Sequence, residues 1–312
     1  MGNKFKLVCI LFTWVLLPWS PSSAQPPPAL KVVASLFPLQ EFARAVGGDQ
    51  VQVALLLPPG AEAHSWEPRP SDVVKVSQAD IFIYVSPSLE PWVDKVLRAA
   101  QSKKLRVLEA SQGLPLIKAE GPEERTGRAG GSRGPEKMDP HLWLDFALDQ
   151  KIVDTIAAAF SEKDPIHAAD YKNNAQIYLG KLNDLDQRYR QALAKCRHRQ
   201  ILLSGHAAFA YLAKRYGLQQ IALSGISPDA EPTPKKMAGV VEMAHKTGIK
   251  FIYVEELVNP KLAQSLSKEA GVGILTLNAG HNLTAQQVKE KVTFLEVMEK
   301  NLKNLEKGLE CQ

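Results

Sequence analysis

Short apolar runs typical of buried strands alternate with helical stretches along most of this chain, and this alternation limits the possible folds more than any other feature. The first series comprises KVVASLF (31–37), QVQVALLLPPG (50–60), DIFIYVS (80–86) and LRVLEA (105–110). The second series comprises RQILLSGH (199–206), LQQIALSGI (218–226), IKFIYVEEL (249–257) and VGILTLN (272–278). Because parallel strands need crossover helices, the pattern predicts an α/β fold with two lobes, each a parallel sheet flanked by helices.

A long helical stretch, residues 164–196, separates the two series. Its apolar side chains recur at helical spacing, at Ile177, Leu182, Leu185, Tyr189 and Leu193. At ~1.5 Å per residue the stretch is about 45 Å long, enough to reach across two lobes. We therefore predict that one long spine helix (164–196) joins an N-terminal lobe (25–163) to a C-terminal lobe (197–312).

The first residues have the organisation of an export signal. Two lysines precede an apolar run (7–19) that is shorter than a membrane span and is broken by Pro18. Small residues follow at 22–24, which predicts a signal peptide over residues 1–24 and an exported mature chain. The one cysteine of this region, Cys9, lies too early for lipid attachment, which favours a periplasmic location.

Charge and cysteine content narrow the possible partners. The formal net charge of +5 is spread thinly, whereas a nucleic-acid binder clusters its Lys and Arg, so we expect no nucleic-acid partner. We also expect the chain to be a monomer. The mature chain keeps Cys196 and Cys311, which in an exported protein can form a disulfide or stay as two thiols; the sequence leaves both open. Residues 118–138, rich in Gly, Arg, Glu and Pro, predict a flexible surface loop.

Three histidines occupy positions where an α/β fold gathers ligands. His64 lies in a loop after the second apolar run, His141 in a loop that enters a helix, and His206 directly after a strand. Ligands of open parallel sheets bind beyond the carboxyl ends of the strands, so histidines of both lobes can meet in the gap between them. Imidazole nitrogens suit zinc, which typically takes four ligands in a tetrahedron. A single loop histidine is most often plain polar surface, and it is the joint pattern that indicates a metal site.

The segments around these histidines resemble a known family. GAEAHSWEPRPSD, DPHLWLD and SGHAAFAYLAKRYGL are similar to the metal-ligand motifs of the solute-binding proteins of zinc and manganese ABC importers, and the similarity covers nearly the whole mature chain. The resemblance implies two lobes bridged by one long helix, with a metal ion in the cleft between them. It also implies delivery of the ion to an ABC permease without catalysis, and it assigns His64, His141 and His206 as ligands.

The resemblance also bears on the metal and on the fourth ligand. Family members with a histidine at the third position are generally zinc proteins, so His206 favours zinc, with manganese as the alternative. Members commonly have an aspartate at the end of the last strand, where this chain has Asn278, a poor zinc ligand. We expect His281 as the fourth ligand, ahead of a water molecule and Glu62. Loop 118–138 lacks histidine, so we expect it to gather no metal.

Other residues and functions stay open. Asp145 and Glu67 are candidate acceptors for the outer nitrogens of the histidines, although helix capping or surface exposure is the commoner role. Glu255 and Glu256 end a strand near the expected cleft, where one could line it.

Three histidines with an open position are also typical of the catalytic zinc of a hydrolase, but no HExxH motif occurs. A surface adhesin of the same fold ranks last, because the sequence shows no anchor for display.

Overall fold

Two parallel four-stranded sheets form the framework of the computed structural model, which describes Gly2 and residues 29–119, 137–226, 232–257 and 260–312. The first sheet has the order β2-β1-β3-β4, with β1 Leu30–Ala34, β2 Val51–Leu55, β3 Ile81–Tyr84 and β4 Arg106–Glu109. The second has the order β6-β5-β7-β8, with β5 Gln200–Leu203, β6 Gln219–Ala222, β7 Phe251–Val254 and β8 Gly273–Thr276. The predicted α/β class with two parallel sheets is confirmed.

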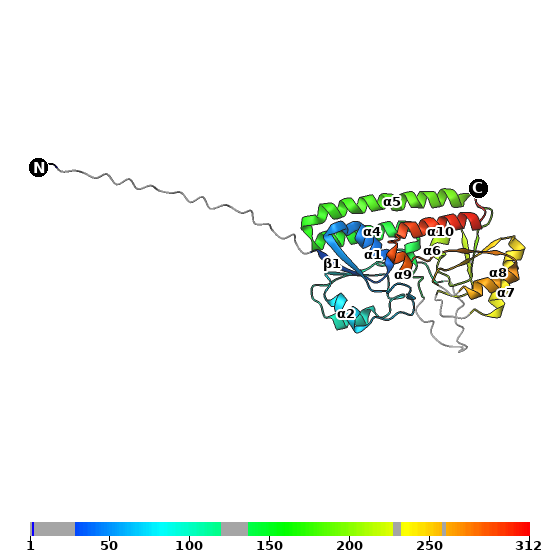
Figure 1. The fold of residues 1–312 in the computed structure, drawn as a ribbon, viewed down its shortest axis with the longest axis horizontal. Coiled ribbons are helices and arrows are strands. Elements are labelled where there is room, and N and C mark those ends of the chain that lie inside the picture. Colours follow the sequence, from blue (N-terminus) through cyan, green and yellow to red (C-terminus); the bar gives the residue numbers. More distant parts are fainter. Residues whose placement is uncertain (1, 3–28, 120–136, 227–231, 258–259) are drawn as a thin grey trace.

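Helices cover the sheets, and one of them spans both (Figure 1). The helices of the first half are α1 Phe37–Gly47, α2 Pro70–Ser77, α3 Val93–Ala100, α4 Phe146–Lys163 and α5 Ala168–Ala194. Those of the second half are α6 Ala210–Arg215, α7 Pro234–Thr247, α8 Lys261–Ala270, α9 Ala285–Lys289 and α10 Phe294–Gly308. In Figure 1, α5 runs along one side of the molecule beside α4 and α10, which fits the predicted spine.

The apolar side chains are buried in one central core and two outer ones. The central core joins the two sheets and takes side chains from α1, α4, α5 and α10, including Phe42, Phe146, Tyr189 and Phe294. The outer cores lie on the far face of each sheet, under α2 and α3 in one lobe and under α7 and α8 in the other. Because the central core is continuous, packing holds the two sheets in a fixed relation on the side of the spine.

The buried face of the spine helix differs from the apolar stripe that the sequence predicted. Its buried face consists of Tyr171, Ala175, Tyr178, Leu182, Leu185, Tyr189 and Leu193. Ile177 was included in the predicted apolar stripe but is 54% exposed, because its neighbour Tyr178 takes the core-facing position. A 3-10 turn, Pro165–His167, precedes α5 and takes up the first residues of the predicted stretch.

The predicted final helix from Thr284 is two helices. Helix α9 ends at Lys289, and Lys291 adopts a left-handed backbone conformation with φ of 55°. Thr293 then caps a new helix, α10: its hydroxyl accepts from the backbone N–H of Glu296, and the Glu296 carboxylate accepts from the backbone N–H of Thr293. This reciprocal cap starts α10 at Phe294 and breaks the continuous helix that periodicity alone indicates.

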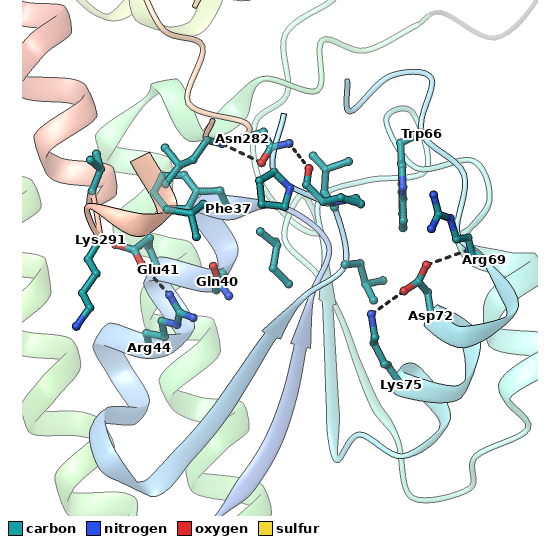
Figure 2. Close-up of a pocket in the computed structure, with 18 of the residues that line it drawn as sticks. Phe37, Gln40, Glu41, Arg44, Trp66, Arg69, Asp72, Lys75, Asn282 and Lys291 are labelled. Carbon is teal, nitrogen blue, oxygen red and sulfur yellow. Dashed lines mark hydrogen bonds and ion pairs between the residues drawn. The ribbon is translucent and has the colours of Figure 1, made fainter. Parts of the chain in front are cut away.

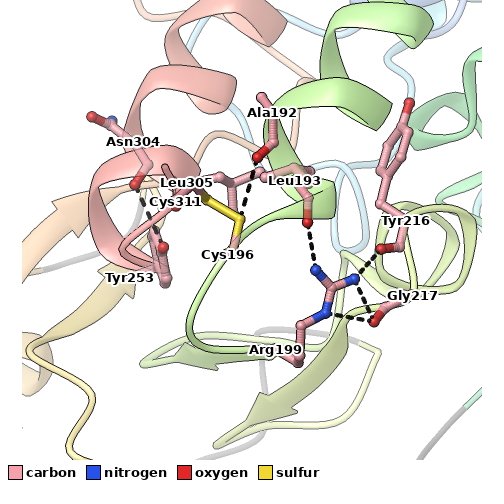
Figure 3. Close-up of a disulfide and its surroundings, with 10 residues drawn as sticks. All are labelled: Ala192, Leu193, Cys196, Arg199, Tyr216, Gly217, Tyr253, Asn304, Leu305 and Cys311. Carbon is pink, nitrogen blue, oxygen red and sulfur yellow. Dashed lines mark hydrogen bonds between the residues drawn. A yellow bond between two sulfur atoms is a disulfide. The ribbon is translucent and has the colours of Figure 1, made fainter.

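A disulfide joins Cys196 and Cys311, which settles the alternative that the sequence left open (Figure 3). It links the end of the spine to the residues after α10. The guanidinium of Arg199 lies below it and donates to the backbone carbonyls of Leu193, Tyr216 and Gly217. The segment between α5 and β5 is therefore held in place by both a disulfide and hydrogen bonds.

Some predictions fall on residues outside the described ranges. The signal peptide (1–24) lies there almost entirely, as does loop 118–138 between its ends, where Lys118 and Met138 form an antiparallel bridge. The domain limits 25–163, 164–196 and 197–312 stay a prediction. None of the helices within the described residues combines the length and the apolar character that crossing a bilayer requires.

Candidate metal centre

Three loops bring His64, His141 and His206 together. His64 lies between β2 and α2, His141 directly precedes the 3-10 turn Leu142–Leu144 before α4, and His206 follows β5. His64 comes from the side of the first sheet and His206 from the side of the second. The loops meet where the carboxyl ends of the parallel strands face the gap between the sheets, the usual ligand position in such folds.

The ring nitrogens of these histidines converge on one point. Nε2 of His141 lies 3.2 Å from Nε2 of His64 and 3.2 Å from Nε2 of His206. One ligand atom of each of the three lies within 4.8 Å of the others, and within the described residues this is the one such group of His, Cys, Asp or Glu side chains. His141 and His206 are fully buried and His64 is half-buried. Two zinc-bound nitrogens at ~2.0–2.1 Å in a tetrahedron would be about 3.3 Å apart, which matches these separations.

Two buried carboxylates orient two of these rings. Oδ1 of Asp139 lies 2.8 Å from Nδ1 of His141 and also accepts from the backbone N–H of His141. Oε1 of Glu255 lies 2.7 Å from Nδ1 of His206. An ionised carboxylate only accepts hydrogen bonds, so each ring donates from Nδ1 and turns a lone pair on Nε2 toward its neighbour. Two lone pairs 3.2 Å apart repel each other unless a proton or a metal ion lies between them.

These contacts set the protonation of the histidines. Burial, followed by the nearby histidines, lowers the pKa of His64 to about 2, and burial likewise holds the pKa of His141 well below its usual 6.5. Burial also disfavours charge on His206, but the Glu255 carboxylate outweighs it and raises the pKa of His206. Burial raises the pKa of Asp139 to about 7. His64 and His141 are therefore neutral at physiological pH, whereas the Glu255 carboxylate favours the protonated, charged form of His206 when no metal is bound.

Asp145 and Glu67 have the commoner roles that the sequence analysis gave for them, helix capping and surface exposure. Asp145 caps α4 by accepting from the N–H of Ala147 and pairs with Arg215, while Glu67 is exposed. The acceptors are Asp139, which the sequence analysis did not name, and Glu255, which it placed near the cleft.

Local sequence signals could have pointed to these two acceptors. Asp139 stands two residues before His141 across a proline, so the Asp-Pro turn returns its carboxylate to the ring. Glu255 lies just beyond β7, which pairs with β5, the strand before His206. A Cβ on Gly205 would collide with the Glu255 carboxylate, so the Ser-Gly-His motif clears the space for that contact.

The candidates for a fourth ligand lie at the edge of this group. The ring of His281 is buried, its centre lies 6.5 Å from that of His206, and neither of its nitrogens has a hydrogen-bond partner in the described structure. Glu62 lies 3.9 Å from Nε2 of His281 and accepts from the backbone N–H of His64. Asn278 is turned away, because its amide donates to Glu256 and its oxygen accepts from the N–H of Gly280.

Comparison with known proteins also indicates a zinc-binding protein. Residues 32–308 match the model of the ZnuA family, described as zinc-uptake complex component A, periplasmic. The zinc-binding lipoprotein AdcA of Streptococcus pneumoniae is 38% identical over 277 residues, which cover 88% of this chain and 55% of that protein. The chain thus spans little more than half the length of the AdcA relatives. The high-affinity zinc uptake system protein ZnuA of Bacillus subtilis is 34% identical, with 90% and 88% covered.

Solved structures agree with the sequence comparison. The Zn(II)-bound ZnuA-like domain of Streptococcus pneumoniae AdcA superposes with a TM-score of 0.75 at 36% identity, covering 90% of this chain and 99% of that domain. The laminin-binding protein Lmb of Streptococcus agalactiae, described as having adhesin and metal-transporting activity, superposes with a TM-score of 0.78 at 31% identity, covering 90% and 100%. With the paired parallel sheets, the spine and the cluster of histidines, these matches show that the chain belongs to the ZnuA family of zinc-uptake solute-binding proteins, whose members are named for zinc binding and transport and not for catalysis.

Proposed function

We propose that this chain captures one zinc ion between its two lobes through Nε2 of His64, His141 and His206. The observation that carries the proposal is the pair of 3.2 Å separations centred on His141 Nε2, with carboxylates holding the outer nitrogens of two rings. That arrangement turns the Nε2 atoms of the three rings toward one point at separations suitable for a tetrahedral metal ion, which would replace the proton of His206. Zinc relatives support the same ion.

We infer that His281 supplies the fourth ligand. A buried imidazole whose two nitrogens both lack a hydrogen-bond partner in the described structure is costly unless something binds it, and the ring of His281 lies 6.5 Å from that of His206. A small inward movement of the segment 278–283 would bring it to the ion. Glu62 is the second candidate, because its carboxylate faces the same space.

Imidazole-rich ligation favours zinc over manganese, which prefers carboxylate oxygens. A zinc-dependent hydrolase is not supported, since the family and the relatives are named for zinc binding and uptake. The two positioned carboxylates, Asp139 and Glu255, are buried and each accepts from Nδ1 of a ring, so they lie behind the rings, on the side away from the converging Nε2 atoms where a general base would have to stand.

Zinc titration of single-histidine variants tests the site. His64→Ala, His141→Ala and His206→Ala should each weaken zinc binding well over tenfold in a chelator competition, because each removes one of few ligands. His245→Ala is the matched control, since its ring bonds the carbonyl of Ala270 and lies in α7, away from the histidine loops. His281→Ala and Glu62→Gln, compared by cobalt absorption, separate the two candidate fourth ligands. Wild-type affinity in the His141→Ala variant would refute the site.

We further propose that the chain works in the periplasm and passes zinc to the membrane permease of an ABC importer. The family description as a periplasmic uptake component supports this. A strain without the chain should grow poorly under zinc limitation. The intact gene should restore growth, but a version without residues 1–24, or one with His141→Ala, should not. Rescue by the leaderless version would contradict the location, and rescue by His141→Ala would contradict transport through this site.

Similarity to Lmb gives a second candidate function, attachment to laminin. Binding of the purified chain to immobilised laminin, with and without zinc, tests it directly. Saturable binding that survives removal of zinc would support attachment, and no binding above an albumin control would exclude it.

A further inference from the structure

A buried side-chain amide joins the two loops that carry histidines on opposite sides of the metal centre. Asn282 is 1% exposed, and its Nδ2 donates to the backbone carbonyls of Pro58 at 2.7 Å and Ala61 at 2.8 Å. Its Oδ1 accepts from the N–H of Leu283 at 2.8 Å, which fixes the plane of the amide. Both donors and the acceptor are used, so the amide is held in one orientation.

The joined segments are far apart in the sequence and both lead to the site. The first, residues 58–64, follows β2 and carries Glu62 and His64. The second, residues 278–283, follows β8 and carries His281. One backbone hydrogen bond accompanies the amide, from the N–H of Gly60 to the carbonyl of Leu283 at 2.8 Å. A loop of the first sheet is thereby fastened to a loop of the second, beside the rings.

Packing gives the first of these segments little support from outside. Pro58, Pro59 and Gly60 are exposed, and a cavity of about 680 Å³ lies against the segment, with Pro58, Pro59, Trp66, Asn282 and Leu283 among its lining residues. Figure 2 shows Asn282 at the wall of this cavity, with its hydrogen bonds to the carbonyl of Pro58 and from the N–H of Leu283. Ala61 and Ala63 pack against the central core on the inner side of the segment, whereas its exposed tip, residues 58–60, is held to residues 278–283 by the bonds from Asn282 and Leu283.

We propose that Asn282 is a positioning residue that controls how fast zinc leaves the site. The proposal rests on the proposed zinc function. His141 and His206 are fully buried and His64 is half-buried, so on this proposal the ion leaves on the side of His64, when His64 and its segment move away from residues 278–283. That movement must break both hydrogen bonds of the Asn282 amide. The amide therefore slows release without touching the ion.

Zinc release into an excess of a chromogenic chelator, followed by stopped flow, tests this role. Asn282→Ala should release zinc about tenfold faster or more, because two neutral hydrogen bonds are lost at the step that opens the site. Asn282→Ser keeps one short donor, so its rate of zinc release should lie between those of Asn282→Ala and the wild type. It replaces Asn282→Ala in the test if the alanine variant does not fold. The cobalt absorption spectrum should stay as in wild type, since the ligands are unchanged.

Asn174→Ala is the matched control. Its amide also donates to a backbone carbonyl, that of Val46 at 3.0 Å, but it joins α5 to α1 and lies in neither loop. A purely structural role of Asn282 predicts that both variants lower the melting temperature and neither changes release. Release by Asn282→Ala and Asn282→Ser within twofold of wild type would overturn the proposal. A wild-type protein that binds no zinc would instead refute the proposed function.

Discussion

Single residues behind the histidines decide how strongly the rings can hold a cation. Glu255 is buried, its pKa is kept below its usual value by the neighbouring His206 despite the opposing effect of burial, and it lies at hydrogen-bond distance from His206 Nδ1. Glu255→Gln keeps the shape but removes the charge. We expect zinc affinity to fall about 10- to 100-fold, the usual cost of losing such an acceptor, as measured by chelator competition.

The adjacent Glu256 supplies the control for that experiment. Its carboxylate accepts from Asn278 and Gln287 and pairs with Lys300, without contacting an imidazole. Glu256→Gln should leave zinc affinity unchanged. Equal losses in the two variants would mean that general electrostatics, and not the orientation of His206, explains the effect.

Zinc binding should also release protons, and their number follows from the pKa shifts. The pKa of His206 is raised above 6.5, so at pH 6 this ring is protonated and its proton takes the place of a cation. Asp139, with its pKa raised to about 7, is also mostly protonated at pH 6. His64 and His141 are already neutral.

Calorimetry in buffers of different ionisation enthalpy should therefore detect about two protons released per zinc at pH 6, and fewer as pH rises past both raised pKa values. Zinc affinity should therefore fall as pH falls, because protonated His206 and Asp139 must lose their protons before zinc binds. Release of four protons at pH 6 would show that His64 and His141 are charged in the free protein as well, which contradicts their lowered pKa values.

At the scale of elements, the sequence predicted strands and helix types better than their limits. Alternation of apolar runs indicated every strand of both sheets, because buried parallel strands have a strong composition signal. The break at Lys291 was missed, since periodicity continues across it and only the Thr293 cap marks the new start. Ile177 was misplaced for a similar reason: two adjacent apolar residues, Ile177 and Tyr178, cannot be ranked without knowing which faces the core.

The histidines were easier to find than their partners. A histidine after a strand end has a position that topology alone makes meaningful. The contact of Glu255 with His206 depends on strand pairing and on the absent side chain of Gly205, neither of which one sequence reveals. The bonds from Asn282 reach 221 and 224 residues along the chain, so only the folded structure shows them.

The spine helix offers a test of stability within one element. Gly180 lies in the middle of α5, is exposed, and has open space where a Cβ would stand. Gly180→Ala should raise the free energy of unfolding by about 0.5–1 kcal/mol, since alanine loses less backbone entropy in a helix. Urea denaturation of the zinc-free protein measures it.

Gly248 gives the opposite expectation for the same substitution. It ends α7 with φ of 68° and also has open space around it, so the two glycines differ in backbone conformation and not in packing. Gly248→Ala should lower the free energy of unfolding by about 1 kcal/mol, because an L side chain is strained there. A stabilising effect at both sites would contradict this account of the helix ends.

At the scale of the whole molecule, two connections of different kind restrain the lobes. The continuous central core and α5 hold them together on one side, while the Asn282 amide fastens their loops at the metal centre. The first connection is extensive and apolar, and the second consists of a few hydrogen bonds. Opening of the site should therefore involve movement of the loops over a nearly fixed framework, with the polar connection breaking first.

The disulfide belongs to the framework, which makes its removal a test of this division. Cys196 and Cys311 are separated by 115 residues and enclose β5 to β8. Replacing both with serine frees a long loop in the unfolded chain and should lower the free energy of unfolding by about 4–5 kcal/mol on the chain-entropy account. Zinc release measured on the folded double variant should stay near the wild-type rate, since neither cysteine lies in the histidine loops. Faster release with unchanged stability would reverse the roles assigned to the disulfide and to Asn282.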